Sequence, residues 1–231
     1  MIDLYYAPTP NTWKVSIMLE ECGLPYRAVP IDIMNNDQKS PEFLAINPNG
    51  RIPAIVDHDG PEAPLSVFES GAILIYLAEK TGRFLAPAGR ARADALGWLM
   101  WQMGGLGPMA GQAHHFRRYA PDGNAYATDR FVNETARLYG VMDTHLASHE
   151  WLAGSDYSIA DVASWGWVWY HRMQGQDLKH FPSVARWFFA MSGRPAVQRG
   201  KVLGLETLSD EPRARTEGPY YGANGPAPGA L

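Results

Sequence analysis

The sequence predicts a fold of two parts, a small α/β unit followed by an all-α unit. Strand-like and helix-like segments alternate over residues 1–80. After residues 81–90, which hold two Gly and one Pro and resemble a linker, strand patterns nearly vanish. Helical patterns then continue to residue 205, and an irregular tail is expected over residues 206–231.

The composition is that of a globular protein. With 46% hydrophobic and 12% aromatic residues, the chain of 231 residues can bury a substantial core. Its formal net charge is −4, and no long run of Lys or Arg occurs. We therefore expect neither a nucleic-acid partner nor an anionic-membrane partner.

Cysteine usage and the start of the chain bear on redox chemistry and location. The single cysteine, Cys22, excludes an internal disulfide and any zinc site built on cysteine pairs. The first residues lack the basic and apolar regions of a secretory signal, and no apolar run approaches the length of a membrane span. These features predict a cytoplasmic protein.

The first strand and helix are predicted over Ile2–Tyr6 and from Asn11 to Cys22. Ala7 and Pro8 end the strand. Apolar residues in the helix follow the i, i+3, i+4, i+7 spacing of one buried face, and Gly23 supplies a C-terminal stop. Cys22 lies on that face, at the end remote from the strand, as a small core residue.

Thr9 and Asn11 lie at the junction between this strand and this helix. Helix N-termini carry unpaired N–H groups and partial positive charge. The hydroxyl and the amide could therefore polarise a thiol or hold an anion. The alternative is that the two residues only cap the helix, as Thr and Asn often do.

The rest of the α/β unit contains three more strands and two helices. We expect strands at Tyr26–Ile33, Ile52–Asp57 and Leu65–Phe68, and helices at Ser40–Ile46 and Ala72–Lys80. Ser70 is the predicted N-cap of the last helix, and Ile52-Pro53 is a candidate cis peptide. The order β-α-β followed by β-β-α is that of a thioredoxin-like unit.

Five helical segments are expected in the all-α unit. The Gly and Pro residues of 104–108 should bend or interrupt the first of them. Ser158 with Asp161 forms a capping-box pattern before a largely apolar helix. The predicted segments are 90–103, 128–148, 159–170, 182–192 and 196–203.

Several separated blocks of the sequence resemble the motifs of one protein family, and they occur in the order that this family has. These blocks are Tyr-Ala-Pro-Thr-Pro-Asn (6–11), Asn-Pro-Asn-Gly-Arg-Ile-Pro-Ala-Ile-Val-Asp (47–57), Phe-Glu-Ser-Gly-Ala-Ile-Leu (68–74), Gly-Gly-Leu-Gly-Pro-Met (104–109) and Tyr-Ser-Ile-Ala-Asp (157–161). The chain resembles a cytosolic glutathione transferase over nearly its whole length. Within that superfamily it is similar to the nu class, the bacterial disulfide-bond oxidoreductases related to the yeast nitrogen-regulation prion protein. The resemblance implies the glutathione transferase fold.

The resemblance also implies a glutathione site. Glu69 and Ser70 resemble the pair that holds the ammonium and carboxylate of the γ-glutamyl end. Ile52, before Pro53, would pair its main chain with the cysteinyl unit. Gln38 and Arg51 resemble contacts nearer the glycyl carboxylate, and a solvated loop Gln is the alternative for Gln38.

In the family pattern Thr9 and Asn11 stand where a residue acts on the glutathione sulfur. A hydroxyl or amide donor favours the thiolate and lowers the thiol pKa. Tyr5 and Tyr6 are the alternatives for this role. Since Cys22 is expected to be buried and remote, disulfide reduction would proceed through glutathione sulfur alone.

Further residues are implied at the edges of this site. Arg130 resembles a residue that reaches glutathione from a neighbouring subunit, with a surface salt bridge as the alternative. An acceptor side would be lined by Trp98, Gln102, Gln112, His114 and His115. The two histidines could equally be surface residues, and no metal-binding motif supports them as ligands.

The resemblance predicts a homodimeric enzyme that reduces small disulfides. Reduced glutathione would be the substrate and oxidised glutathione the product, with no metal. One alternative is a transferase that conjugates glutathione to electrophiles. Another is a non-catalytic glutathione-binding regulatory protein, because fold alone does not fix activity.

Overall fold

A mixed four-stranded sheet organises the N-terminal part of the computed structural model, which describes residues 1–60, 63–121 and 123–203. The strands are β1 (Ile2–Tyr6), β2 (Tyr26–Pro30), β3 (Ala54–Asp57) and β4 (Leu65–Phe68), in the order β2-β1-β3-β4. β1 pairs in parallel with β2, whereas the β1–β3 and β3–β4 pairs are antiparallel.

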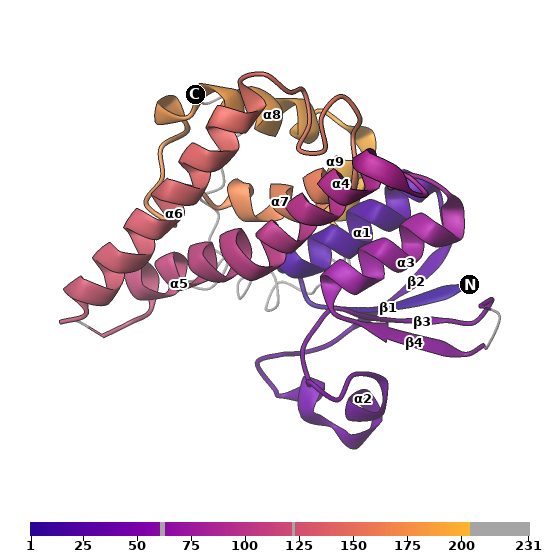
Figure 1. The fold of residues 1–231 in the computed structure, drawn as a ribbon. Coiled ribbons are helices and arrows are strands. Elements are labelled where there is room, and N and C mark those ends of the chain that lie inside the picture. The colour runs from indigo at the N-terminus through magenta and orange to yellow at the C-terminus, as the bar shows by residue number, and fades with distance from the viewer. Residues whose placement is uncertain (61–62, 122, 204–231) are drawn as a thin grey trace.

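Helices cover both sides of this sheet. α1 (Pro10–Cys22) and α3 (Ser70–Thr81) lie on the side that faces the helical part of the molecule (Figure 1). The short α2 (Pro41–Ile46), preceded by the 3-10 turn η1 (Asp37–Lys39), lies on the opposite side. This arrangement confirms the predicted thioredoxin-like unit.

All the named elements of the second part are helices or helical turns over its described residues. Its elements are α4 (Gly89–Trp101), the π-helical turn η2 (Gln102–Leu106), α5 (Gly107–Arg118), α6 (Ala125–Leu146), α7 (Ile159–Trp169), the 3-10 turn η3 (Leu178–His180), α8 (Pro182–Ser192) and α9 (Pro195–Lys201). α5 and α6 form an antiparallel pair, and α7 runs through the middle (Figure 1). The predicted all-α part is confirmed.

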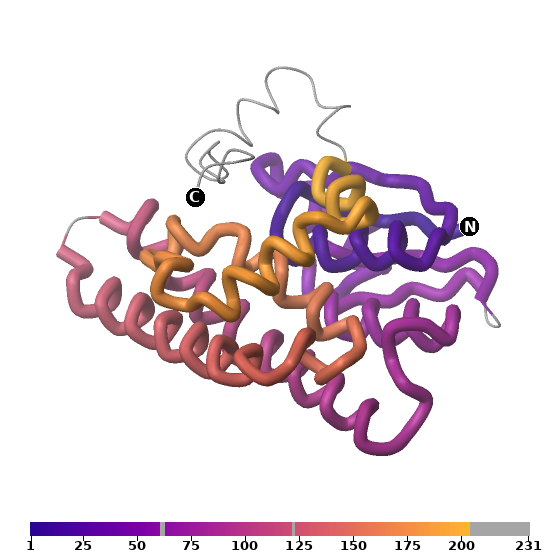
Figure 2. The backbone as a smooth tube through the Cα atoms, turned by 90° about the horizontal axis from the view of Figure 1, so that it is seen from above, coloured from indigo at the N-terminus to yellow at the C-terminus, as the bar shows by residue number. Residues whose placement is uncertain are grey.

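Two helices of the second part dock on α1. α7 packs against its N-terminal half, and α9, the last described helix, lies along it (Figure 2). Ser16 Oγ donates a hydrogen bond of 2.7 Å to the carbonyl of Gly200. A Cβ atom at Gly200 would lie 2.6 Å from the backbone nitrogen of Ile17, so glycine is what permits this approach.

The capping box at the start of α7 forms as predicted. The Ser158 hydroxyl accepts a bond from the Ala160 N–H, and the Asp161 carboxylate accepts one from the Ser158 N–H. Asp161 is fully buried and also accepts bonds from Leu152 N and Trp187 Nε1. The Asp161 carboxylate thus joins the start of α7 to α8 through Trp187, and to the segment before α7 through Leu152.

Several sequence predictions need correction. β2 ends at Pro30 and not at Ile33, and α5 (Gly107–Arg118) is a full helix in a stretch where none was predicted. A π-helical turn absorbs Gly104 and Gly105 without ending the helical path, and Gly107 and Pro108 begin α5. Cys22 is only half-buried, because α1 ends there beside Thr81. The predicted tail of 206–231 lies outside the described residues.

Candidate functional site

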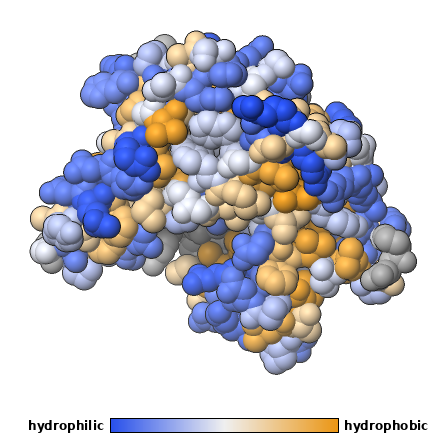
Figure 3. Space-filling view, in the orientation of Figure 1, coloured by the Kyte–Doolittle hydropathy of each residue, from blue (hydrophilic) through white to orange (hydrophobic). Residues whose placement is uncertain are grey.

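A cavity of about 710 Å³ lies where the two parts of the chain meet. Figure 3 shows the surface hollowed between the lobe that carries α2 and the helices beside it. The cavity walls come from the start of α1, the loops before β3 and α3, and the η2, α5 and α7 helices. The residues that line it include Thr9, Asn11, Lys14, Gln38, Asn47, Asn49, Arg51, Ile52, Pro53, Glu69, Ser70, Gln102, Gln112 and Trp167.

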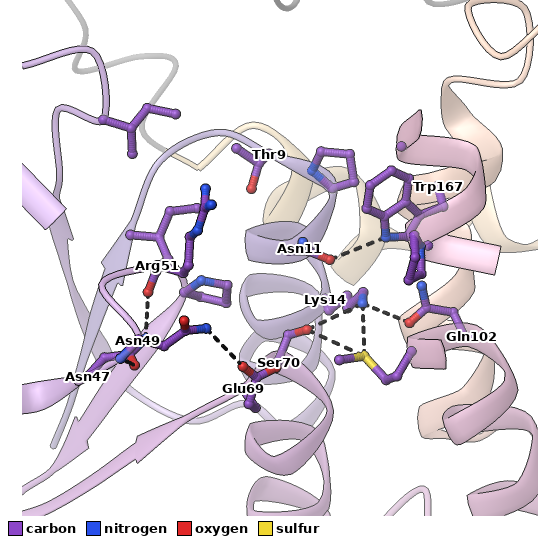
Figure 4. Close-up of a pocket in the computed structure, with 18 of the residues that line it drawn as sticks. Thr9, Asn11, Lys14, Asn47, Asn49, Arg51, Glu69, Ser70, Gln102 and Trp167 are labelled. Atoms are coloured by element: carbon purple, nitrogen blue, oxygen red, sulfur yellow. Dashed lines mark hydrogen bonds between the residues drawn. The ribbon is translucent and has the colours of Figure 1, made fainter. Parts of the chain in front are cut away.

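Thr9 is the N-cap of α1, as the capping alternative predicts. Its backbone is extended (φ −131°), and its hydroxyl oxygen accepts a bond of 3.3 Å from the Thr12 N–H. Asn11 does not cap the helix. Its Oδ1 accepts a bond of 3.2 Å from Trp167 Nε1, which leaves the amide nitrogen turned toward the cavity (Figure 4). The two residues therefore have different structural roles.

The opposite wall is the loop that leads into β3. Asn47 Nδ2 donates a bond of 2.6 Å to the carbonyl of Arg51, and this bond closes the loop around the cavity. The Ile52–Pro53 peptide is cis, as predicted. Gln38 presents a buried Oε1 without a hydrogen-bond partner among the described residues.

Glu69 and Ser70 meet the cavity at the start of α3. Ser70 was predicted to be the N-cap, but the N-cap is Glu69, with φ of 67° and ψ of 116°. Ser70 is the first helical residue, and its hydroxyl bonds to other cavity residues instead of to its own helix. A left-handed φ is uncommon for a residue other than glycine and is found at functional sites.

Lys14 is a cavity residue that sequence reasoning missed. Its side chain is 1% exposed, and Nζ donates a bond of 2.7 Å to Gln102 Oε1 and one of 3.3 Å to Ser70 Oγ (Figure 4). Burial lowers the pKa of Lys14 to about 7, against a raising effect of Glu69. Its spacing of four residues from the buried Met18 could have indicated an inward-facing lysine.

Three of the predicted acceptor-side residues do not line this cavity. The Trp98 ring packs 5.0 Å from that of Trp101 and 4.5 Å from that of His145. His115 is exposed on α5, where its ring lies 5.3 Å from that of Phe116. Because of the helical repeat, Trp98 lies on a side of α4, and His115 on a side of α5, that does not meet the cavity.

His114 is the third of these residues. Its ring stacks 5.7 Å from that of Tyr170, and Nε2 is buried without a hydrogen-bond partner in the described chain. Burial and the nearby Arg118 lower the pKa of His114 to about 4. His114 is therefore a neutral packing residue at physiological pH and not a surface histidine. Gln102 and Gln112, by contrast, do line the cavity.

The remaining candidates lie elsewhere. Arg130 is exposed on α6 and does not line the cavity within one subunit. Tyr6 is 2% exposed in the core, and Tyr5 packs edge-on against Phe43, so neither alternative tyrosine lines the cavity. Cys22 is at the far end of α1, where burial raises the pKa of its thiol.

The described part of the chain lacks two further kinds of feature. No cluster of three or more His, Cys, Asp or Glu side chains placed to hold a metal ion occurs among residues 1–60, 63–121 and 123–203. Within those same ranges, none of the helices combines the length and the apolar character that a membrane crossing requires.

A thioredoxin-like unit, a helical unit and a polar cavity between them define the glutathione transferase class of proteins. The sequence profile of the glutathione S-transferase N-terminal domain matches residues 9–80, and that of the C-terminal domain matches residues 106–195. The chain belongs to the glutathione S-transferase family.

Two proteins of Escherichia coli K12 are similar to this chain in sequence. The chain is 52% identical over 214 residues to the disulfide-bond oxidoreductase YfcG of Escherichia coli K12, a match that covers 91% of this chain and 98% of YfcG. It is 41% identical over 215 residues to the disulfide-bond oxidoreductase YghU of the same organism, covering 87% of this chain and 74% of YghU.

Two solved structures of glutathione transferases are similar to this chain in fold and in sequence. A glutathione transferase family member from Pseudomonas fluorescens Pf-5, with two glutathione bound, superposes with a TM-score of 0.82 at 47% identity. That match covers 87% of this chain and 92% of the other. A glutathione transferase from Pseudomonas putida, with one glutathione disulfide per subunit, gives 0.83 at 46% identity, covering 87% and 91%.

Proposed function

We propose that this protein is a glutathione-dependent disulfide reductase that works through bound glutathione thiols. The observation that carries the proposal is the contrast between the cavity and the cysteine. The cavity presents donors and a carboxylate suited to a charged tripeptide, whereas Cys22 is at the opposite end of α1. The relatives named disulfide-bond oxidoreductases and the neighbours with bound glutathione support the same reaction.

The tripeptide would lie across the cavity from α3 to the α2 side. Glu69 would pair with the γ-glutamyl ammonium, and Ser70 with the N–H groups that begin α3 would bind the γ-glutamyl carboxylate. The main chain of Ile52, next to Pro53, would pair with the cysteinyl unit. The buried Oε1 of Gln38 and the exposed guanidinium of Arg51 lie on the side suited to the glycyl end.

Thr9 and Asn11 would act on the sulfur. The Asn11 amide is oriented by Trp167, so its N–H group can donate to a thiolate without first reorganising. The Thr9 hydroxyl accepts a bond from Thr12 N–H and donates a long one, of 3.4 Å, to Thr12 Oγ1, so its proton would have to turn from Thr12 to the sulfur. Both donors favour the thiolate over the thiol and so lower the thiol pKa.

The reaction would then be two thiol–disulfide exchanges. The bound glutathione thiolate attacks one sulfur of the substrate disulfide, which releases one thiolate and forms a mixed disulfide. A second glutathione thiolate attacks the glutathione sulfur of that mixed disulfide. The products are oxidised glutathione and the second substrate thiolate, which takes up a proton from solvent.

The second glutathione requires space beyond the first. Gln102 and Gln112 line the cavity on its helical side and would form part of this acceptor region. Trp98, His114 and His115 would contribute only from outside the cavity wall. In a homodimer, Arg130 of the other subunit would supply a cation to this region. A cytoplasmic location would supply reduced glutathione.

A transferase that conjugates electrophiles is the second candidate, favoured by the family to which the chain belongs. Two turnover assays with glutathione separate the functions, one with hydroxyethyl disulfide and one with a chloronitrobenzene. Fast disulfide reduction with slow conjugation is expected. The reverse ratio would favour the transferase, and glutathione binding with neither reaction would favour a regulatory protein.

A further inference from the structure

The wall of the cavity contains the buried amine of Lys14, which no carboxylate contacts among residues 1–60, 63–121 and 123–203. Lys14 Nζ contacts Gln102 Oε1 at 2.7 Å, Met103 Sδ at 3.2 Å and Ser70 Oγ at 3.3 Å. All three partners are uncharged. A buried charge is ordinarily paired, because its transfer from water is costly. The uncompensated charge therefore indicates that an anion binds beside Lys14.

Gln102 places a second donor in the same corner of the cavity. Its side chain is fully buried, and its Oε1 is already used by Lys14. Its Nε2 has no hydrogen-bond partner in the part of the chain that the structure describes. A buried N–H group without an acceptor costs free energy unless a ligand supplies one. Both donors line the cavity (Figure 4).

Other charged groups surround Lys14 at greater distance, and the exposed Arg51 lines the same cavity. Glu69, the N-cap of α3, favours the charged ammonium, but burial outweighs it and the pKa of Lys14 falls to about 7. On α1 and α9, Glu20 pairs with Arg199 at the opposite end of α1. On α7, Asp161 accepts bonds from Ser158 of its capping box and from Trp187 of α8. Ligand charge can therefore change the protonation of Lys14 substantially.

We propose that Lys14 and Gln102 form an anion-recognition site for the γ-glutamyl carboxylate of glutathione, and that Lys14 takes up a proton from solvent as this ligand binds. The inference rests on the proposed function for the identity of the ligand. The carboxylate is assigned because Lys14 contacts Ser70, the residue proposed to bind that group. Binding would pair the protonated Lys14 with a carboxylate and would satisfy Gln102 Nε2.

The pH dependence of ligand affinity follows from the coupling between ligand binding and the protonation of Lys14. Only the protonated ammonium attracts the carboxylate, so the ligand raises the pKa of Lys14. Below pH 7 the free protein already holds this proton, and binding takes up little. Above pH 7 binding must supply it, so affinity falls as the pH rises toward the pKa of the complex.

The test is calorimetric binding of S-methylglutathione, which has no thiol proton to lose. Titrations in two buffers of different ionisation enthalpy, between pH 6 and 8, count the protons taken up. We expect an uptake of roughly half a proton near pH 7 in the unaltered protein. Lys14→Met should abolish the uptake, flatten the pH profile and weaken binding about tenfold or more. The matched control is Lys179→Met, on the exposed η3 turn.

A second variant keeps the test decisive if Lys14→Met does not fold. Gln102→Glu gives Lys14 a carboxylate of its own, so proton uptake should vanish and S-methylglutathione binding should weaken. Wild-type uptake and affinity in either folded variant would overturn the proposal, as would a failure of the unaltered protein to bind S-methylglutathione. Normal binding and uptake without disulfide reduction would overturn the proposed function alone.

Discussion

At the scale of single residues, Thr9 and Asn11 stand two positions apart and are held differently. Thr9 is fixed by its own helix through Thr12, whereas Asn11 is fixed by Trp167 from the other part of the chain. The orientation of Asn11 therefore depends on the tertiary fold. A substitution at Asn11 tests chemistry, and one at Thr9 tests chemistry and helix stability together.

Asn11→Ala should lower the kcat/KM for disulfide reduction by about 10- to 100-fold, because one oriented donor to the thiolate is lost. It should also raise the pKa of the bound glutathione thiol, which the ultraviolet absorbance of the thiolate reports. Unfolding free energy should change little. An unaltered thiol pKa would contradict the role proposed for Asn11.

Thr9→Ala should lower the unfolding free energy by about 1 kcal/mol, because the α1 cap is lost, in addition to any loss of activity. Thr9→Ser is the matched control, since it keeps the hydroxyl that both roles require. Denaturant melts and the disulfide-reduction assay separate the two effects. Equal stability of the Ala and Ser variants would show that the cap contributes nothing.

Cys22→Ala should leave disulfide reduction nearly intact. The thiol is half-buried at the far end of α1, and burial raises its pKa, so it is a poor nucleophile. Turnover with hydroxyethyl disulfide measures this outcome. Loss of activity in a variant that still melts like the unaltered protein would refute a mechanism based on glutathione sulfur alone.

Much of the candidate site could be predicted at this scale, because local motifs carry it. Junctions between strands, loops and helices can be recognised in a sequence, and they hold Thr9, Glu69, Ser70 and Ile52-Pro53. Lys14 lies inside a helix, where no such junction marks it. Its partners are 56 and 88 residues away, and a lysine on an amphipathic helix ordinarily indicates a solvated side.

At the scale of helices, α5 and α7 must approach closely to orient Asn11. A Cβ atom at Gly111 on α5 would lie 3.1 Å from the Trp167 ring on α7. That ring also holds the Asn11 amide through Nε1. The spacing between the two helices therefore determines the position of the Asn11 amide, the donor that we propose acts on the glutathione sulfur.

Gly111→Ala should displace Trp167 and lower disulfide reduction, although alanine favours helix formation. We expect overpacking to cost about 1–3 kcal/mol in unfolding free energy. The matched control is Gly140→Ala on α6, where a Cβ meets nothing within 4 Å. That variant should keep full activity and gain up to about 1 kcal/mol in stability. Equal behaviour of the two variants in both assays would contradict this account.

The buried Asp161 in the capping box of α7 should make the unfolding free energy depend on pH. Burial raises the pKa of Asp161 to about 6, above its ordinary value. Such a group stabilises the fold most at low pH, and its contribution declines as the pH rises from about 4 to about 6. Asp161→Asn should remove this slope and lower stability by about 1–3 kcal/mol, since an amide cannot accept every bond of the carboxylate. Denaturant melts from pH 4 to 7 measure both effects, and an unchanged slope would refute the assignment.

Helix and strand identity were predictable where apolar spacing or caps were strong, as for α1, α7 and α8. The extent of α5 was not, because its Gly, Pro and polar residues disfavour a helix locally. Packing against α6 and continuity through the π-helical turn stabilise it instead. These are tertiary contributions that local propensity does not contain.

At the scale of the whole molecule, the two parts share one continuous core. Buried residues of the sheet unit and of the helical unit form a single cluster, and Trp13 of α1 stacks on Tyr170 after α7. We therefore expect cooperative unfolding in which both parts melt together. The division of the chain into independent units at 80 and 90 stays a prediction.

The order of synthesis gives the packing of α9 a further consequence. α1 leaves the ribosome long before α9, the helix that covers its outer side. Until α9 emerges, the surface of α1 around Ile17 lacks the cover that α9 gives it. We therefore expect a nascent chain of this protein to expose an apolar strip of α1 between the synthesis of the two helices, to which a ribosome-associated chaperone can bind.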